Sequence, residues 1–152
     1  MDNMTAYFPY PLHHCKILHL VRHGQAMHNV EGDKNRDALL SPHLFDAQLS
    51  PLGCEQVDQL RKHFHASGLL NRIDLVITSP LLRGFVLVTG GEGLWTRPEK
   101  EIAVVSHGIV LQQMLNVLGN DCNNTIRTTL CKRFDNGELR SVVIVDKTGG
   151  MQ

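Results

Sequence analysis

Two histidines, His23 and His107, each follow a short apolar run and each precede a glycine. Arg22 comes directly before the first histidine, and Arg83 follows a third apolar run. A guanidinium group binds the oxygens of a phosphoryl group in pairs, and each such charge-assisted hydrogen bond contributes about 1.5–3 kcal/mol. A neutral imidazole can also attack phosphorus and carry the phosphoryl group covalently. These residue types therefore favour a site for phosphoryl groups.

The elements that must position these residues are short strands. Four apolar runs have the length and composition of buried strands, and the last of them follows a turn at Asp135-Asn136-Gly137. The predicted strands are centred on residues 17–21, 75–77, 102–105 and 142–145. The predicted strands and helices alternate along the chain, which is typical of an α/β fold. We expect a three-layer α/β/α domain with a mostly parallel central sheet.

Two helices are predicted between these strands. Ser50 can cap the first helix with Pro51 at its first position, and Gly68 is a natural stop. A second helix is predicted over 109–118, where apolar residues recur at helical spacing. By contrast, residues 30–49 are polar and are predicted to form a long loop. Residues 1–15 form an irregular lead-in to the domain.

Three neighbouring strand ends would deliver two arginines and two histidines to one place, because ligands in open α/β sheets bind beyond the carboxyl ends of the strands. Each residue alone also fits a structural role. His107 is compatible with a hydrogen-bonded histidine at a strand end, and Arg83 with an exposed cation at a helix start. Their joint occurrence favours the phosphoryl site.

The composition is that of a globular domain. Hydrophobic residues make up 42% and charged residues 20% of the chain, and 152 residues suit a single domain, 1–152. Fifteen basic residues cancel fifteen acidic ones, so bulk charge favours neither nucleic acid nor an anionic membrane. No apolar run approaches the ~20 residues of a membrane span, and no signal-peptide pattern is present. We expect a soluble cytoplasmic protein that binds neither nucleic acid nor membranes.

The cysteines and the remaining histidines predict no metal site. The four cysteines show no Cys-x-x-Cys spacing, and reduced thiols are expected. The pairs at 13–14 and 63–65 offer histidine ligands, but His63 and His65 cannot share one face of a helix. We therefore expect neither a metal nor a cofactor.

Four segments, LVRHGQAMHN, LSPLGCEQ, ITSPLLR and VVSHG, occur in this order along the chain. Together they resemble the histidine phosphatase superfamily, and in particular its phosphoglycerate mutase-like proteins. The resemblance spans residues 16–83 and 95–146. It implies the phosphoglycerate mutase-like fold and phosphoryl transfer through a phosphohistidine.

The resemblance also implies residue roles. His23 would be the nucleophile, and Arg22, Arg83 and His107 would clamp the phosphoryl group around it. Ala26 stands where many members carry Ser or Thr, so one hydroxyl contact is missing. The residues that the resemblance assigns to phosphate binding are Arg22, His23, Gly24, Gln25, Asn29, Arg83, His107 and Gly108.

The chain departs from the family pattern in an atypical junction at 84–94. In the family, a long segment after the third of these motifs supplies a carboxylate that protonates the leaving group. Here four glycines interrupt a short stretch that rejoins the pattern at Trp95, and an internal deletion after Arg83 is the simplest explanation. Loss of a general acid costs about 10²–10⁴ in rate. Carboxylates that could replace it are Glu31, Asp33 and Glu92, although each is also typical of a solvated loop.

Two functions remain open at this point. The first is phosphomonoester hydrolysis, with carbohydrate metabolism as one setting that the family implies. It is favoured over a mutase because the second phosphate site of a mutase would fall largely in the missing segment. The alternative is a catalytically weak or inactive protein that binds phosphorylated ligands. The expected partner is a small phosphorylated substrate, and its identity and the oligomeric state are left open.

Overall fold

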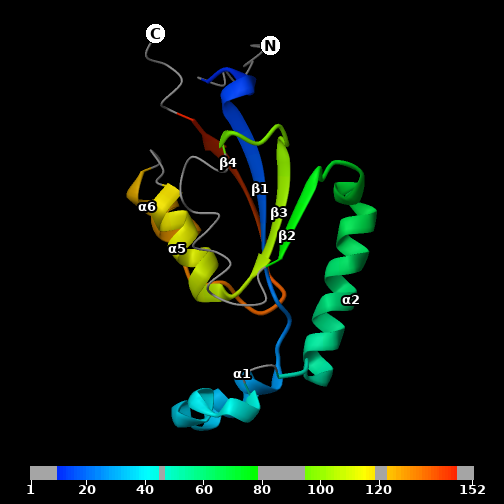
Figure 1. Cartoon of the computed structure of the whole chain (residues 1–152), viewed down its shortest axis with the longest axis vertical. Helices are drawn as coiled ribbons and strands as arrows, with labels where there is room; N and C mark the ends of the chain where they lie inside the picture. Colours follow the sequence, from blue (N-terminus) through cyan, green and yellow to red (C-terminus); the bar gives the residue numbers. More distant parts are fainter. Residues whose placement is uncertain (1–9, 45–46, 79–94, 119–122, 147–152) are drawn as a thin grey trace, which may run out of the picture.

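The computed structural model describes residues 10–44, 47–78, 95–118 and 123–146 (Figure 1). The helices and strands in these ranges are β1 (Cys15–Arg22), α1 (Met27–Lys34), α2 (Pro51–Ala66), β2 (Leu75–Thr78), β3 (Glu101–Ser106), α5 (Gly108–Leu118), α6 (Asn124–Leu130) and β4 (Leu139–Val145). Short 3-10 turns lie at Leu12–His14, Arg36–Leu40, Pro42–Leu44 and Leu69–Asn71. All four predicted strands are therefore confirmed.

The four strands form one sheet in the order β2-β3-β1-β4. β3 runs parallel to both of its neighbours, whereas β4 pairs antiparallel with β1. The prediction of a mostly parallel sheet is confirmed, and the direction of β4 is new. In the register of the central pair, Arg22 lies opposite Ser106, so both strands end at the same level.

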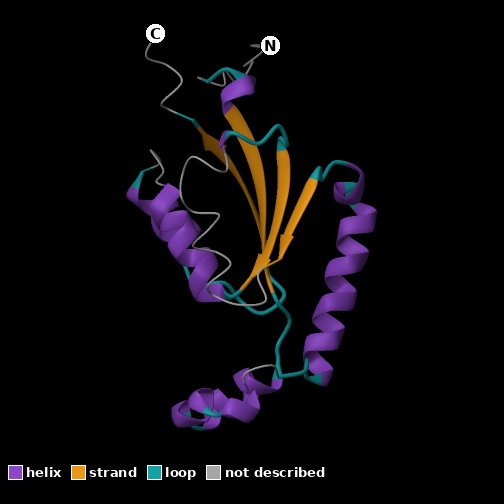
Figure 2. Ribbon diagram, in the orientation of Figure 1, coloured by secondary structure: helices purple, strands orange, loops and turns teal. Residues whose placement is uncertain are grey.

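Helices cover both faces of the sheet. Helix α2 lies along one face, and α5 and α6 lie on the other (Figures 1 and 2). The chain thus has the predicted α/β fold with three layers.

The hydrophobic core lies between the sheet and α5. Alternate side chains of β1 and β3 point to this face and are almost completely buried. Helix α5 meets them with the apolar stripe that predicted it, and Phe134 closes the core with no exposed surface. The buried members of this core are Leu18, Leu20, Ile102, Val104, Leu111, Met114, Leu115, Phe134 and Ile144.

Helix α2 begins and ends where the sequence predicts. The Ser50 hydroxyl accepts a hydrogen bond from the Gly53 amide at 3.0 Å, and Gly68 adopts a positive φ of 69° just beyond the helix. Its packing is much looser than that of α5, because Gly53 is its one buried residue. A cavity of about 390 Å³ separates α2 from the sheet.

The predicted loop over 30–49 is wrong in its first part. Helix α1 continues to Lys34, and 3-10 turns follow it. The Asn29 side chain accepts a hydrogen bond from the Ala26 amide at 3.0 Å, which satisfies a backbone donor at the helix start. None of the α1 residues is buried, so the helix carries no apolar stripe from which it could have been predicted.

A polar cluster crosses the sheet away from the strand ends. His19 is 2% exposed on β1, and its two ring nitrogens lie 2.7 Å from Ser141 Oγ and 2.9 Å from Glu101 Oε1. Glu101 also forms an ion pair with Arg72 at 3.2 Å. Both nitrogens of the buried imidazole are therefore hydrogen-bonded, as burial of a polar group requires.

None of the helices in the described ranges is long and apolar enough to cross a membrane.

Candidate active site

His23 and His107 meet just beyond the ends of the two central strands. Their ring centroids lie 4.9 Å apart in an edge-to-face arrangement. The His23 amide donates to the Ser106 carbonyl at 3.1 Å, which continues the sheet pairing by one residue. After β1 the chain leads to α2 on one face, and after β3 to α5 on the other (Figure 1). This divergence is the place where open α/β sheets bind ligands.

The His23 ring is held in one tautomer. Its Nδ1 lies 2.7 Å from the Gly24 carbonyl oxygen. A carbonyl oxygen can only accept, so Nδ1 carries the proton in the neutral ring. The lone pair of neutral His23 is therefore on Nε2, the nitrogen left free for a nucleophilic role.

His28 is a third imidazole at the site, and the sequence argument gave it no role. It lies in the first turn of α1, and its ring centroid is 5.6 Å from that of His23. Burial, followed by the charge of His23 and then that of Arg22, lowers the pKa of His28. Burial likewise leads the causes that lower the pKa of His107. Both rings therefore favour the neutral form near pH 7.

Arg22 is 8% exposed, and its side chain lies beside Gly108 at the start of α5. Its Nη1 donates to the Phe134 carbonyl at 2.5 Å, whereas its Nε is buried with no hydrogen-bond partner among the described residues. Burial is the main cause that lowers the pKa of Arg22, followed by Arg133. A buried guanidinium with an unpaired N–H is typical of a site that awaits an anion.

A loop at 134–138 supports both Arg22 and His23, although the sequence predicted only a turn there. The Gly137 amide donates to the His23 carbonyl at 3.1 Å, and the Arg22 amide donates to the Glu138 carbonyl at 3.0 Å. Gly137 has a positive φ of 71°, which suits the predicted turn. Only the folded sheet brings this loop beside β1, so no local sequence signal indicated the contact.

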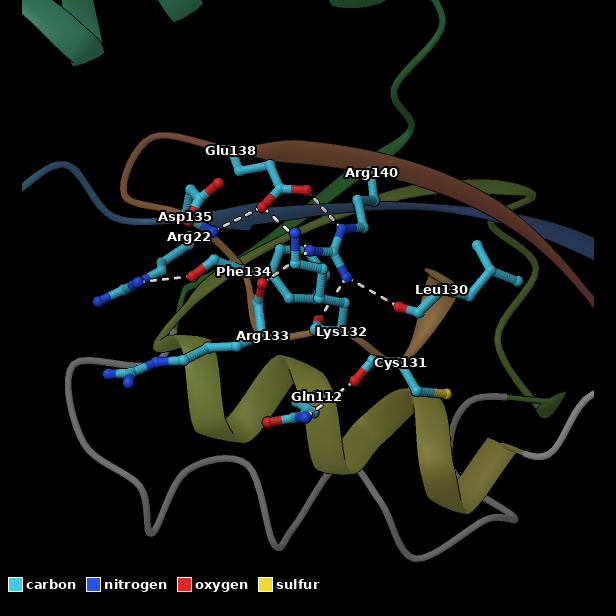
Figure 3. A network of polar contacts seen from close by, with 10 residues as sticks. All are labelled: Arg22, Gln112, Leu130, Cys131, Lys132, Arg133, Phe134, Asp135, Glu138 and Arg140. Carbon is cyan, nitrogen blue, oxygen red and sulfur yellow. Dashed lines mark hydrogen bonds and ion pairs between the residues drawn. The ribbon is translucent and has the colours of Figure 1, made fainter. Parts of the chain in front are cut away.

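Arg140 holds this loop in place (Figure 3). Its guanidinium donates to the carbonyls of Leu130, Lys132 and Arg133, at 2.8, 2.6 and 3.0 Å. It also pairs with Glu138 and lies 3.8 Å from the centre of the Phe134 ring. The network therefore fixes the Phe134 carbonyl to which Arg22 is anchored.

Gln25 and Asn29 already have partners within the protein. Gln25 Oε1 accepts from the Ser50 hydroxyl at 2.7 Å, and the backbone amide of Gln25 donates to Gln56 Oε1 at 2.8 Å. Asn29 Oδ1 accepts from the Ala26 amide. These contacts join the loop after β1 to the starts of α1 and α2, so the two residues position the loop in this structure.

The glycines beside the histidines allow parts of the protein to approach one another. A Cβ at Gly24 would lie 2.6 Å from the Gly53 carbonyl oxygen, so the position admits the close approach of α2. A Cβ at Gly108 would lie 3.1 Å from Cδ and Nε of Arg22. Gly108 therefore makes room for the guanidinium at the start of α5.

Three of the residues with expected roles remain without a described contact at the site. Arg83 and Glu92, with the junction 84–94, lie outside the described residues. Glu31 pairs with Lys34 on the surface of α1 at 2.9 Å. Asp33 is exposed, and its charge partly opposes the lowering of the Arg22 pKa that burial causes. Among the described residues, no group of three or more His, Cys, Asp or Glu side chains is placed to hold a metal ion.

The fold places two histidines and a buried arginine at the ends of the central strands, and comparison with known proteins gives the family. The chain is 33% identical to phosphoglycerate mutase-like protein 1 of Arabidopsis thaliana, with 91% of this chain and 84% of that protein covered. It is 32% identical to phosphoglycerate mutase-like protein 2 of the same plant, with 91% and 76% covered. The chain belongs to the phosphoglycerate mutase-like family of the histidine phosphatase superfamily. No family model and no solved structure matches it.

The lengths of these alignments bear on the missing segment. They run over 238 and 262 residues, whereas the present chain has 152. Each relative therefore carries residues within the aligned stretch that have no counterpart here. This agrees with an internal deletion, and its place after Arg83 stays a prediction.

Proposed function

We propose that the protein hydrolyses phosphomonoesters through a phosphohistidine formed on His23. Two neighbouring residues carry the proposal. The bond from His23 Nδ1 to the Gly24 carbonyl leaves Nε2 of His23 free, and the adjacent Arg22 has a buried guanidinium whose Nε has no partner among the described residues. The expected partner is a small phosphorylated substrate in the cytoplasm.

The reaction has two steps. Nε2 of neutral His23 attacks phosphorus, the N–P bond forms, and the bond from phosphorus to the ester oxygen breaks. The ester oxygen leaves with the bonding electrons and takes a proton from solvent. Water then attacks phosphorus and loses a proton to solvent, the N–P bond breaks, and inorganic phosphate leaves with neutral His23 restored. Arg22 and His107 stabilise the charge on the phosphoryl oxygens throughout.

The nature of the leaving group decides how much a missing proton donor matters. An aryl oxide leaves without protonation, whereas an alkoxide requires an acid. His28 lies beside His23, but its lowered pKa leaves it mostly neutral near pH 7 and therefore a weak proton donor there. Asp33 is a carboxylate whose charge reaches Arg22. We expect faster hydrolysis of aryl than of alkyl phosphates.

A second function is favoured by the alignment lengths. Because the relatives carry residues that this chain lacks, the shortened protein is also compatible with binding of phosphorylated ligands and little turnover. In that case the anion site is retained and the catalytic cycle is not completed.

Hydrolysis of para-nitrophenyl phosphate in the presence of a chelator tests the proposal. The wild-type protein should release nitrophenol, and His23→Ala should lose at least about 10³-fold in rate, as removal of a nucleophile does. Exposed His63→Ala is the matched control and should retain the activity. Phosphate binding by a cooperatively folded wild-type protein without turnover would favour the second function.

A further inference from the structure

The space between α2 and the sheet, called here the α2 groove, begins at the phosphoryl site. Its wall includes His23 and Gly24 at one end and Leu70 and Ile73 at the other. It is therefore continuous with the site described above, and its volume of about 390 Å³ is within the range of small-molecule pockets.

The groove is apolar along its length. The sheet contributes Val21, Ala103 and Val105, and α2 contributes Leu60 and Phe64. Among the described residues, every side chain that lines it, apart from Arg22 and His23 at the one end, is apolar. A sugar or other polyol placed here would lose hydrogen bonds to water without replacement, at a cost for each buried hydroxyl. A hydrocarbon chain would lose none.

The groove is open to a ligand. Val57 on α2 and Val76 on β2 both line the groove, and they are 42% and 58% exposed. From Val57 to Phe64, helix α2 rises about 10 Å, room for a chain of roughly eight carbons. Charge at one end and a hydrocarbon wall beyond it match a molecule with a phosphoryl head and an apolar tail.

We propose that the α2 groove binds the hydrocarbon part of an amphiphilic phosphomonoester whose phosphoryl group lies at His23. The proposal rests on the function proposed above and names its substrate class. A phosphorylated alcohol with a chain of medium length or an extended aromatic group is then preferred over a phosphorylated polyol.

Binding of alkylphosphonates, whose P–C bond is not hydrolysed, tests the groove independently of turnover. Isothermal titration calorimetry with methyl-, butyl- and octylphosphonate should show affinity rising about twofold or more per methylene, or about 100-fold from methyl to octyl. The double variant Val57→Gln, Val76→Thr should lose most of this gain. The double variant Leu52→Gln, Val143→Thr changes equally exposed apolar residues outside the groove and should keep the gain.

Three results would overturn the proposal: affinity that does not change with chain length, a gain that persists in the groove variant, and dimerisation of the wild-type protein that the groove variant abolishes. The last would show that a second copy occupies the groove. Circular dichroism melts establish that each variant is folded. A chain-length gain in a protein that hydrolyses no phosphate ester would support the groove and refute the proposed hydrolysis.

Discussion

The two faces of the sheet differ in how completely they are packed. On the α5 face, Leu18, Leu20 and Phe134 have no exposed surface. On the α2 face, Val57 and Val76 leave about half of their surface in water. Both faces end at the same pair of histidines, so one site borders a dense core on one side and an apolar groove on the other.

The two faces have different roles: the dense face positions Arg22, and the loose face leaves room for a ligand. The dense face fixes Arg22, because Phe134 supplies both a core side chain and the carbonyl that binds the guanidinium. The loose face leaves apolar surface beside His23 unfilled. A packed core resists changes in side-chain position, whereas an open groove tolerates them. The chemistry is thus built on the rigid side and the space for a ligand on the other.

The same truncation on the two faces should have very different costs. Phe134→Ala removes a buried ring from the core and should lower the free energy of unfolding by about 3–5 kcal/mol. Phe64→Ala removes a half-buried ring from the groove wall and should cost about 1 kcal/mol. Urea denaturation of both variants measures the difference, and equal losses would contradict the contrast between the faces.

A methyl group at Gly108 should disturb the site without disturbing the fold. Gly108→Ala places a Cβ 3.1 Å from Nε of Arg22, so the guanidinium must move. A displacement of about 1 Å costs on the order of 10²-fold in rate. The shift required here is a few tenths of an ångström, so we expect a loss of about 3- to 10-fold in kcat/KM for an aryl phosphate. Alanine favours helix over glycine, so the melting temperature should not fall.

Asn116→Ala, on the exposed face of the same helix, is the control and should keep full activity. Unchanged kcat/KM in Gly108→Ala would show that the position of Arg22 does not limit the reaction.

The strands and the helices α2 and α5 could be predicted because their signals are local. Ser50, Pro51 and Gly68 mark the two ends of α2 by their own backbone preferences. Helix α1 was missed because its residues are polar, and α6, capped by Asn123, was not predicted either. The antiparallel direction of β4 could not be predicted either, because an apolar run indicates that a strand forms but not the direction in which it pairs.

The candidate site was predictable only in part for the same reason. His23 and His107 lie at strand ends, and parallel pairing of the strands follows from the alternating pattern. The loop at 134–138 supports Arg22 and His23 through contacts between residues more than 100 positions apart. No local pattern encodes such contacts.

The smallest expected effect is a pH dependence confined to the histidine end of the site. Burial lowers the pKa of His28 and of His107 in the folded protein. The unfolded chain then binds protons more readily, so stability is fully present above the ordinary histidine pKa of about 6.5 and is lost as pH falls through the lower folded values. His28→Asn should flatten the decline in melting temperature between pH 7 and pH 5.

Exposed His63→Asn is the control for this series and should leave the slope unchanged. A slope that is equally steep in His28→Asn would show that proton uptake by other groups accounts for the acid sensitivity.

The most direct test of the central claim is to trap the phosphoryl group on the protein. The wild-type protein is mixed with para-nitrophenyl phosphate, quenched in alkali where phosphohistidine persists, and digested for mass spectrometry. We predict a phosphoryl group on the peptide that contains His23, at Nε2, and none in His23→Ala. Turnover without this adduct, or an adduct on another residue, would contradict nucleophilic catalysis by His23.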